Sequence, residues 1–366
     1  MTKPSLIKLE QFNGLKLKSY CTSLKKINKL SIINELPDIV GIKPRLVLGH
    51  GSNIFFLSTK KKPLSSLVLL NQLKGIEKIE EKNKKIFIRC YAGENWNDFV
   101  SWTLNRSIGG LENLTLIPGS VGAAPVQNIG AYGVEICNRI SSINAWDFKL
   151  KKTVHIKAKD CLFGYRNSIF KQQMLEEGWQ NTRYLILYVD FKLWPEKNSP
   201  LITSYSGINE ALDGQPTPKK ISKIVKKIRT HKLPDLSKLP NIGSFFQNPT
   251  IQSSLAKKLK KKFPTIPEFE KTSCSSKLSA AWLIEKANFK GYRIGDAGIY
   301  DKHSLIVVNH GKACTYDVMK LTKKIQKTIF IKYGIWLIPE PNIISSYEKI
   351  AYSLMNPMSQ IYTQRG

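Results

Sequence analysis

The sequence predicts an α+β protein with two or three domains, and three observations support this. The chain has 366 residues, enough for more than one hydrophobic core. Short apolar runs typical of strands are interspersed with segments whose apolar residues recur at helical spacing. From Leu114 to Val134 the chain carries no charge and is rich in glycine, proline and alanine. This stretch predicts a loop whose backbone closely approaches a large cofactor.

The composition limits the classes of function. The formal net charge is +30, but only nine of the 57 basic residues are arginines, and the lysines are spread from end to end. Specific nucleic-acid recognition favours an arginine-containing basic stripe, so this pattern argues against it. The N-terminus lacks the apolar core of a secretory signal. Pro118, Pro125 and the glycines make the uncharged stretch a poor membrane helix.

The cysteines and histidines indicate neither a metal site nor a disulfide scaffold. Six cysteines are scattered along the chain, without a CxxC pair and without a histidine at metal-ligand spacing. Disulfides are the alternative, but the pattern favours reduced, mostly buried thiols in a cytoplasmic protein.

The N-terminal third predicts strands on either side of a glycine-rich turn. We expect one short helix and one strand within 1–44, then strands at Arg45–Leu48 and Ile54–Leu57. The turn between these two strands, Gly49–Asn53, lacks the third glycine and the following helix of a dinucleotide fingerprint. It is either a tight hairpin turn or a phosphate-binding turn, and His50 is expected to be a solvated turn residue.

The central region predicts a helix between strands. Further strands are expected at 66–70 and 85–89. A helix capped by Asn95 follows, with Trp96, Phe99, Val100, Thr103 and Leu104 on one face and Gly109-Gly110 at its end. Strands are expected at 140–148, 153–158 and 184–191. An amphipathic helix at 219–229 is broken at 231–235, where Pro234 marks a domain boundary.

The C-terminal part predicts a smaller α+β region. We expect helices at 278–287 and 315–332, the second capped by Gly334. Strands are expected at 305–308 and 335–338, and a polar tail at 345–366.

Three residues are candidates for chemistry. Arg166, next to Gly164, Tyr165 and Ser168, suits a side chain aimed into a pocket, although an ordinary surface arginine is the alternative. Ser244 lies between a glycine and two phenylalanines and could present a hydroxyl in a dry site, but no Gly-x-Ser-x-Gly elbow indicates a hydrolase. Glu340 between two prolines is either a carboxylate fixed in direction or an exposed turn acid.

In order and spacing, these segments resemble the UDP-N-acetylenolpyruvoylglucosamine reductase family. The resemblance runs from about residue 45 to 341 and keeps the longer form's tyrosine segment around Tyr205. Its most specific motifs are Pro118-Gly-Ser-Val-Gly122, Gln127-Asn-Ile-Gly-Ala-Tyr-Gly133, Gly164-Tyr-Arg-Asn-Ser168 and Gly243-Ser-Phe-Phe-Gln-Asn-Pro249.

The resemblance implies a two-part FAD-binding module of the vanillyl-alcohol-oxidase (PCMH-type) superfamily and a C-terminal α+β substrate domain. The implied domains are 1–70 (with 342–366 as an optional addition), 71–232 and 233–341. The implied reaction is NADPH-dependent reduction of UDP-N-acetylglucosamine enolpyruvate to UDP-N-acetylmuramate in peptidoglycan biosynthesis. Hydride would pass from N5 of a non-covalent FAD to the enolpyruvyl group.

The family's roles carry over residue by residue. Ser244 would protonate the α-carbon, while Arg166 and Glu340 stabilise the enolate, tasks that suit these side-chain types in a desolvated site. Tyr205, Lys232 and Asn248 match positions that hold the substrate diphosphate or close over it. The implied FAD contacts are Gly49, Gly51, Ser52, Asn53, Pro118, Gly119, Ser120, Gly122, Asn128, Gly130, Ala131 and Gly133.

We further expect a cytoplasmic monomer without a membrane, metal or specific nucleic-acid partner. Two other classes are weighed against it. A different flavin oxidoreductase of the same superfamily would react with O₂ and not with the enolpyruvyl sugar. A basic nucleic-acid-binding protein would keep sequence-preferring binding at physiological salt.

Overall fold

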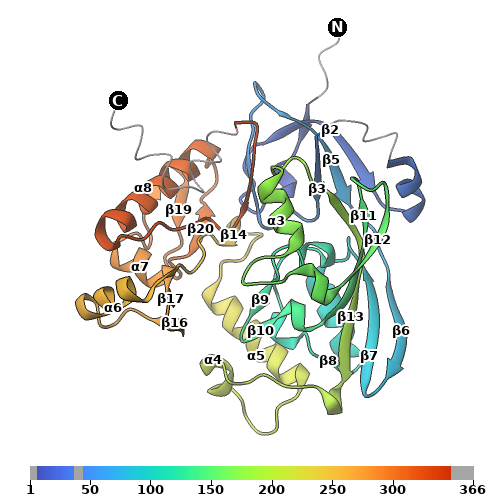
Figure 1. The fold of residues 1–366 in the computed structure, drawn as a ribbon. Coiled ribbons are helices and arrows are strands. Elements are labelled where there is room, and N and C mark those ends of the chain that lie inside the picture. Colours follow the sequence, from blue (N-terminus) through green and yellow to red (C-terminus); the bar gives the residue numbers. More distant parts are fainter. Residues whose placement is uncertain (1–5, 37–43, 348–366) are drawn as a thin grey trace. The chain divides into compact units, whose positions relative to one another are not determined.

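The computed structural model describes residues 6–36 and 44–347 (Figure 1). The chain folds into two compact units, each built from several segments of the sequence. The first unit comprises residues 1–7, 21–51 and 65–231, and the second comprises 8–20, 52–64 and 232–366. The three-domain division of the sequence stays a prediction.

An antiparallel sheet of six strands forms the centre of the first unit (Figure 1). Its order is β12-β11-β13-β7-β6, and β8 pairs with the far end of β13. The predicted strands at 85–89, 140–148, 153–158 and 184–191 are confirmed. The six strands are β6 (Ile76–Lys82), β7 (Lys85–Tyr91), β8 (Ile108–Gly109), β11 (Ile140–Asp147), β12 (Lys152–Lys157) and β13 (Tyr184–Pro195).

Helix α2 (Trp96–Asn105) packs on this sheet by the predicted face. The Asn95 side chain caps it by accepting from the backbone N–H groups of Asn97 and Asp98. Its buried residues are the five expected ones, and Phe99 stacks on Phe191 of β13 at 4.9 Å. The prediction for its end is wrong: Gly109 lies in β8 because Trp194 pairs with it, and the helix has already ended at Asn105.

A second sheet of the first unit has the order β1-β2-β5-β3. Strand β3 runs parallel to β5, so it does not form a hairpin with the strand that follows it in sequence. Of the strand and the helix expected in 1–44, the strand is present, and the described residues 6–36 contain 3-10 turns at 10–12 and 30–35; residues 37–43 lie outside the described part. The strands are β1 (Ile7–Lys8), β2 (Tyr20–Ile27), β3 (Arg45–Leu48) and β5 (Leu64–Asn71).

The remaining elements of the first unit are short, except for α5. Helix α5 is amphipathic, as predicted, and buries Ile221 and Val225, but it continues through His231 and ends at Lys232. The elements are the hairpin β9 (Gly130–Ala131) and β10 (Val134–Glu135), and the helices α3 (Ile169–Glu176), α4 (Ser206–Asn209) and α5 (Pro218–Lys232). Five 3-10 turns lie at 112–114, 121–123, 136–138, 158–161 and 196–198.

The second unit has three small sheets, ordered β14-β20-β19-β18, β15-β17-β16 and β21-β4. Helix α8 packs against β18 and β19 (Figure 1). The predicted helices are confirmed, and Gly334 ends α8 at φ 69°. The elements are β4 (Ile54–Leu57), β14 (Asn241–Ser244), β15 (Thr250–Gln252), α6 (Ser253–Lys262), β16 (Glu268–Lys271), β17 (Ser275–Leu278), α7 (Ala280–Lys286), β18 (Arg293–Ile294), β19 (Ala297–Ile299), β20 (Ile306–Asn309), α8 (Thr315–Tyr333) and β21 (Asn342–Ser345).

The structure decides one open alternative and corrects one prediction. Strand β4 pairs in parallel with β21, residue Ile54 opposite Asn342, which excludes the hairpin alternative for the Gly49–Asn53 turn. Residues 335–338 form no strand, because that segment has only an isolated bridge at its end, between Pro339 and Phe246. The expected polar tail begins in β21, and residues 348–366 lie outside the described part.

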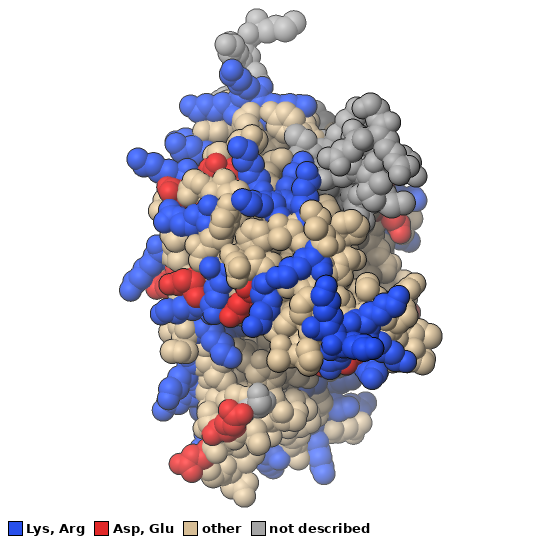
Figure 2. Space-filling model, turned by 90° about the vertical axis from the view of Figure 1, so that its left-hand side faces the viewer, with Lys and Arg blue, Asp and Glu red and all other residues tan. Residues whose placement is uncertain are grey.

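The surface charge is diffuse. On the face drawn in Figure 2, Lys and Arg side chains spread over the whole height, with a few acidic residues among them. All six cysteines are free thiols, and three of them, Cys21, Cys90 and Cys161, are buried. In the described ranges, no helix is long and apolar enough to cross a bilayer.

Candidate active site

The turn after β3 and the uncharged loop lie against each other in the first unit. A Cβ added to Gly49 would collide with Oγ of Ser120, so only glycine permits this approach. Gly51 and Gly119 adopt φ 71° and 136°, conformations that side chains rarely take. The two segments therefore form a cradle with little side-chain bulk. We call these residues, 49–51 and 118–122, the glycine cradle.

The Ala92–Trp96 turn supports the glycine cradle through its backbone. Val121 and Gly122 donate their N–H groups to the carbonyls of Glu94 and Ala92, both at 2.9 Å, and Trp96 donates to the Gly119 carbonyl at 3.0 Å. A Cβ on Gly122 would press against Ala92. The cradle is thus fixed to the end of β7 and the start of α2.

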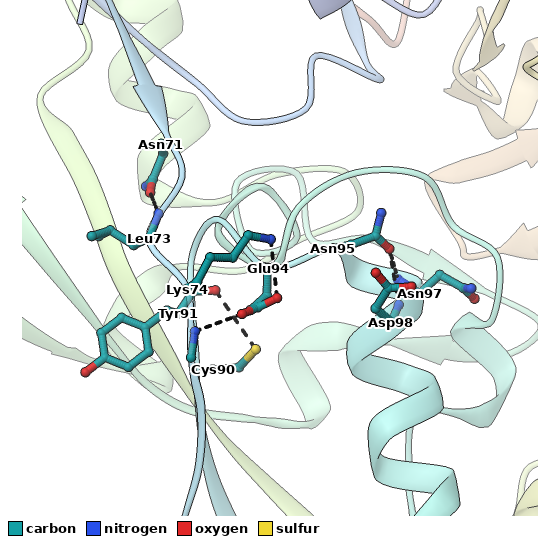
Figure 3. Close-up of polar contacts among 10 residues, drawn as sticks. Asn71, Leu73, Lys74, Cys90, Tyr91, Glu94, Asn95, Asn97 and Asp98 are labelled. Carbon is teal, nitrogen blue, oxygen red and sulfur yellow. Dashed lines mark hydrogen bonds and ion pairs between the residues drawn. The ribbon is translucent and has the colours of Figure 1, made fainter. Parts of the chain in front are cut away.

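The Glu94 carboxylate holds this turn in place (Figure 3). It accepts from the Gly75 N–H at 2.8 Å and from the Lys74 ammonium at 3.3 Å. Asn95, next in the chain, turns to the opposite side and caps α2. One short segment therefore connects the cradle with both the sheet and the helix.

His50 is exposed, as expected, but it also bonds to the cradle. It forms hydrogen bonds with the backbone of Gly119 and Gly93. Desolvation, and after it the Lys74 ammonium, lower the pKa of His50, so the neutral imidazole is favoured at pH 7.

The Arg166 turn contacts the other end of the uncharged loop. Nη2 of Arg166 donates to the Gly130 carbonyl at 3.0 Å, and Oγ of Ser168 donates to the Val126 carbonyl at 2.5 Å. Gly164 and Asn167 exchange two backbone hydrogen bonds of 3.1 Å, which closes the turn. Arg166 itself has φ 53°, and the Lys171 ammonium donates to its carbonyl at 3.1 Å.

Asn128 joins the same two segments through its side chain. This buried amide donates to Glu135 at 2.8 Å and to the Gly164 carbonyl at 3.0 Å, and it accepts from the Cys137 N–H at 3.1 Å. Its side chain therefore braces the loop, while Gly130, Ala131 and Gly133 are half-buried or exposed along the adjoining hairpin. The structure thus brings Arg166 together with the predicted cofactor loop.

In the second unit, Ser244 and Glu340 lie on adjoining segments. Glu340 donates its N–H to the Phe245 carbonyl at 2.8 Å, and Gln247 donates to the Ile338 carbonyl at 3.0 Å. The rings of Phe245 and Phe246 are fully buried, whereas Ser244 and Glu340 are half-buried. Core packing of the two phenylalanines therefore anchors the segment that carries the serine.

The remaining predicted residues are distributed over both units. Ser52 and Asn53 fall in the second unit, where the Asn53 carbonyl accepts from the Asn342 N–H at 3.0 Å. Asn248 accepts from the Ala280 N–H at the start of α7 at 3.0 Å. Lys232 is exposed at the end of α5. Tyr205, 43% exposed, packs edge to face on Tyr132 in the first unit.

Sequence reasoning missed three residues of this region: Asn113, Tyr132 and Arg229. Arg229 follows Ile221 and Val225 at helical spacing, so a cation on the apolar face of α5 was the available signal. Asn113 and Tyr132 carried no such signal. Among residues 6–36 and 44–347, no group of three or more His, Cys, Asp or Glu side chains is placed to hold a metal.

Two family models match the chain. Residues 43–148 match an FAD binding domain, and residues 234–344 match the C-terminal domain of UDP-N-acetylenolpyruvoylglucosamine reductase. The first match contains the glycine cradle, and the second contains Ser244 and Glu340.

Curated relatives match over most of their length. A UDP-N-acetylenolpyruvoylglucosamine reductase of Buchnera aphidicola is 40% identical over 352 residues, which cover 92% of this chain and 98% of the relative. The reductase of that name from Escherichia coli is 37% identical, with 84% and 86% covered. A solved UDP-N-acetylenolpyruvylglucosamine reductase from Thermus caldophilus has a TM-score of 0.64 at 21% identity and covers 93% of this chain and 99% of that one. The predicted fold class is confirmed.

Proposed function

The chain belongs to the UDP-N-acetylenolpyruvoylglucosamine reductase family, and from this membership we propose its reaction in detail. The protein is an FAD-dependent oxidoreductase that uses NADPH to reduce UDP-N-acetylglucosamine enolpyruvate to UDP-N-acetylmuramate. The reaction belongs to peptidoglycan synthesis, and the protein acts as a cytoplasmic monomer. The observation that supports the residue roles best is the backbone bond that places Glu340 beside the Ser244 segment.

The glycine cradle suits FAD. Its walls carry no charge, and the Gly49–Ser120 contact allows no additional side chain, so a flat or phosphate-bearing group meets mainly backbone. Gly49, Gly51, Gly119, Ser120 and Gly122 would hold it there. When bound, FAD supplies the hydride that it has received from NADPH.

Arg166 stabilises the charge that develops in the substrate. Addition of hydride to the β-carbon of the enol ether pushes an electron pair toward the carboxylate, which becomes an enolate. A guanidinium fixed at its other end by the Gly130 carbonyl is oriented before the charge develops, so little reorganisation is needed. Glu340, through a hydrogen bond or as an acid, shares this task.

Ser244 donates the proton that completes the reduction. The enolate collapses as its α-carbon takes the proton from the Ser244 hydroxyl, and solvent restores the serine. A serine hydroxyl is a weak acid, so the step requires a rigid, partly desolvated position. The buried Phe245 and Phe246 rings supply that rigidity.

The substrate diphosphate engages Tyr205, Lys232 and Asn248. Lys232 is exposed and offers a mobile point charge, whereas Asn248 is held by the Ala280 N–H. Tyr205, on the exposed segment before α4, closes over the sugar nucleotide.

The test combines cofactor content with turnover. Purified protein should be yellow and release FAD on denaturation, and it should consume NADPH only when the enolpyruvyl sugar nucleotide is added. Mass spectrometry should find a product heavier by two hydrogens. Colourless protein that FAD cannot reconstitute, or NADPH consumption without that product, would overturn the proposal.

A further inference from the structure

Tyr132 lies in a turn at the edge of the uncharged loop. Tyr132 and Gly133 form the two-residue turn between β9 and β10, with φ of 50° and 81°, and this left-handed conformation is less favourable for tyrosine than for glycine. It follows Gly130 and Ala131, which would face the proposed cofactor, and it belongs to the first unit. Three further contacts hold the residue in this turn.

Asn113 fixes the backbone of Tyr132. Its buried Nδ2 donates to the carbonyl of Tyr132 and to the carbonyl of Ile202, both at 2.9 Å. A Cβ on the neighbouring Gly133 would already press on the Ile202 side chain. One amide group therefore ties the uncharged loop to the segment that leads into Tyr205.

The side chain of Tyr132 lies between Arg229 and Tyr205. Its ring meets the Tyr205 ring edge to face, with centroids 5.0 Å apart and planes at 77°. Its hydroxyl interacts electrostatically with the Arg229 guanidinium, which counteracts part of the rise that burial causes in the pKa of Tyr132. An edge-to-face pair of this kind orients both rings.

Arg229 is an unusual group in this position. It projects from the face of α5 that buries Ile221 and Val225, and within the described part of the chain its buried Nε has no hydrogen-bond partner. A cation in apolar surroundings costs free energy unless it is paired, so its retention points to a use. The neighbouring Tyr132 hydroxyl interacts electrostatically with it.

We propose that Tyr132 is a positioning residue, held by Arg229 and Asn113, that keeps the Tyr205 ring poised to close over the sugar nucleotide. The proposal rests on the proposed function. In this role Arg229 acts through Tyr132. The segment that binds the substrate diphosphate is thereby connected to the loop that binds FAD.

A positioning role differs from a structural one in a measurable way. If Arg229 acts only through Tyr205, its loss weakens substrate binding and leaves the chemical step alone, because binding of the diphosphate is uniform between ground and transition states. Once Tyr205 is truncated, Arg229 has nothing left to position. The two substitutions must then be non-additive.

The experiment measures kcat and KM for the enolpyruvyl sugar nucleotide in the FAD-loaded enzyme. Arg229→Gln should raise KM by about tenfold and change kcat by less than about twofold. Tyr132→Phe, which keeps the ring and removes the hydroxyl, should raise KM in the same direction by less. In a Tyr205→Ala background both substitutions should change KM by less than about 1.5-fold. Lys227→Gln, an equal loss of charge on the exposed face of α5, should match the wild type.

Two outcomes overturn the inference. An equal rise in KM with and without Tyr205, or no rise in any variant, contradicts the positioning role. Arg229→Gln could lose FAD or lower the thermal midpoint of unfolding because α5 is destabilised. In that case the KM of Tyr132→Phe, measured with and without Tyr205, is the test of the positioning role. If wild-type protein fails to turn over the sugar nucleotide, the proposed function itself fails, which is a separate result.

Discussion

The N–H of Glu340 donates to the carbonyl of Phe245 at 2.8 Å, which ties the proline-flanked acid to the residue after Ser244. The bond is made by backbone atoms, so it does not depend on the protonation of the carboxylate. Phe245 is fully buried, and its position in the core therefore fixes both neighbours. Ser244 and Glu340 are almost a hundred positions apart in sequence, and the buried Phe245 keeps their two segments next to each other.

Removing the Ser244 hydroxyl should block protonation of the substrate α-carbon and leave the earlier steps unchanged. In Ser244→Ala, FAD binding and its reduction by NADPH should be unchanged, while flavin reoxidation by the sugar nucleotide slows by at least about tenfold. Stopped-flow absorbance measures both half-reactions. Ser273→Ala, at an exposed serine of the same unit, is the control. A smaller effect would assign the proton to another group.

Replacing Arg166 by lysine should keep the charge and lose the geometry. The bond from Nη2 to the Gly130 carbonyl cannot form, so kcat should fall by about a hundredfold with FAD content unchanged. Arg106→Lys, at the exposed end of α2, should leave the rate alone. A rise in KM without loss of kcat would show that Arg166 only binds the ground state.

Adding one methyl group to Gly49 should weaken FAD binding to the glycine cradle. The new Cβ would collide with Oγ of Ser120, so Gly49→Ala should lower the FAD-to-protein absorbance ratio. Because the obstacle is that hydroxyl oxygen, Gly49→Ala combined with Ser120→Ala should recover part of the FAD. Ser120→Ala alone serves as the reference. Failure of the double variant to recover would locate the defect elsewhere.

Removing the cap of α2 should cost stability. Asn95→Ala leaves the N–H groups of Asn97 and Asp98 without their acceptor and should lower the free energy of unfolding by about 1 kcal/mol. Urea denaturation measures the change. Asn105→Ala, at the exposed last residue of the same helix, controls for altered composition. Equal losses in the two variants would contradict the capping role.

Five of the six thiols should fall into two classes of reactivity. Burial raises the pKa of Cys161 to about 12 and also raises that of Cys21 and Cys90, so few thiolates form at pH 8. Cys274 and Cys314 are exposed. In native protein these two should react first with a disulfide reagent, and the buried thiols only after unfolding. Rapid labelling of Cys161 would show that its surroundings open.

Local sequence patterns predicted many of the helices and strands, but they did not predict which strands pair when the partners are far apart in sequence. The buried face of α2 follows from helical spacing, and all five of its residues were identified. The sequence of β6, Ile76–Lys82, was missed because nearly all of it is exposed and charged, so no apolar alternation marks it. The partner of β4 lies almost three hundred residues away, which no local rule reveals.

In the candidate site, too, residues with a local sequence signal were predicted and residues defined by distant contacts were not. Arg166, Ser244 and Glu340 were found because each lies in an unusual local setting and the motifs around them resemble a family. Tyr132, Asn113 and Arg229 were not found, since their significance arises only when the loop, the 3-10 turn at 112–114 and α5 meet. The contacts that Tyr132 makes with Asn113 and Tyr205 are tertiary and leave no mark in the sequence.

The most direct test of the central claim is anaerobic reoxidation of the flavin. FAD-loaded protein is reduced with one equivalent of NADPH, and UDP-N-acetylglucosamine enolpyruvate is added without oxygen. The oxidised flavin spectrum should return, with one UDP-N-acetylmuramate formed per flavin. A flavin that stays reduced until O₂ is admitted would contradict the account and indicate a different flavin oxidoreductase.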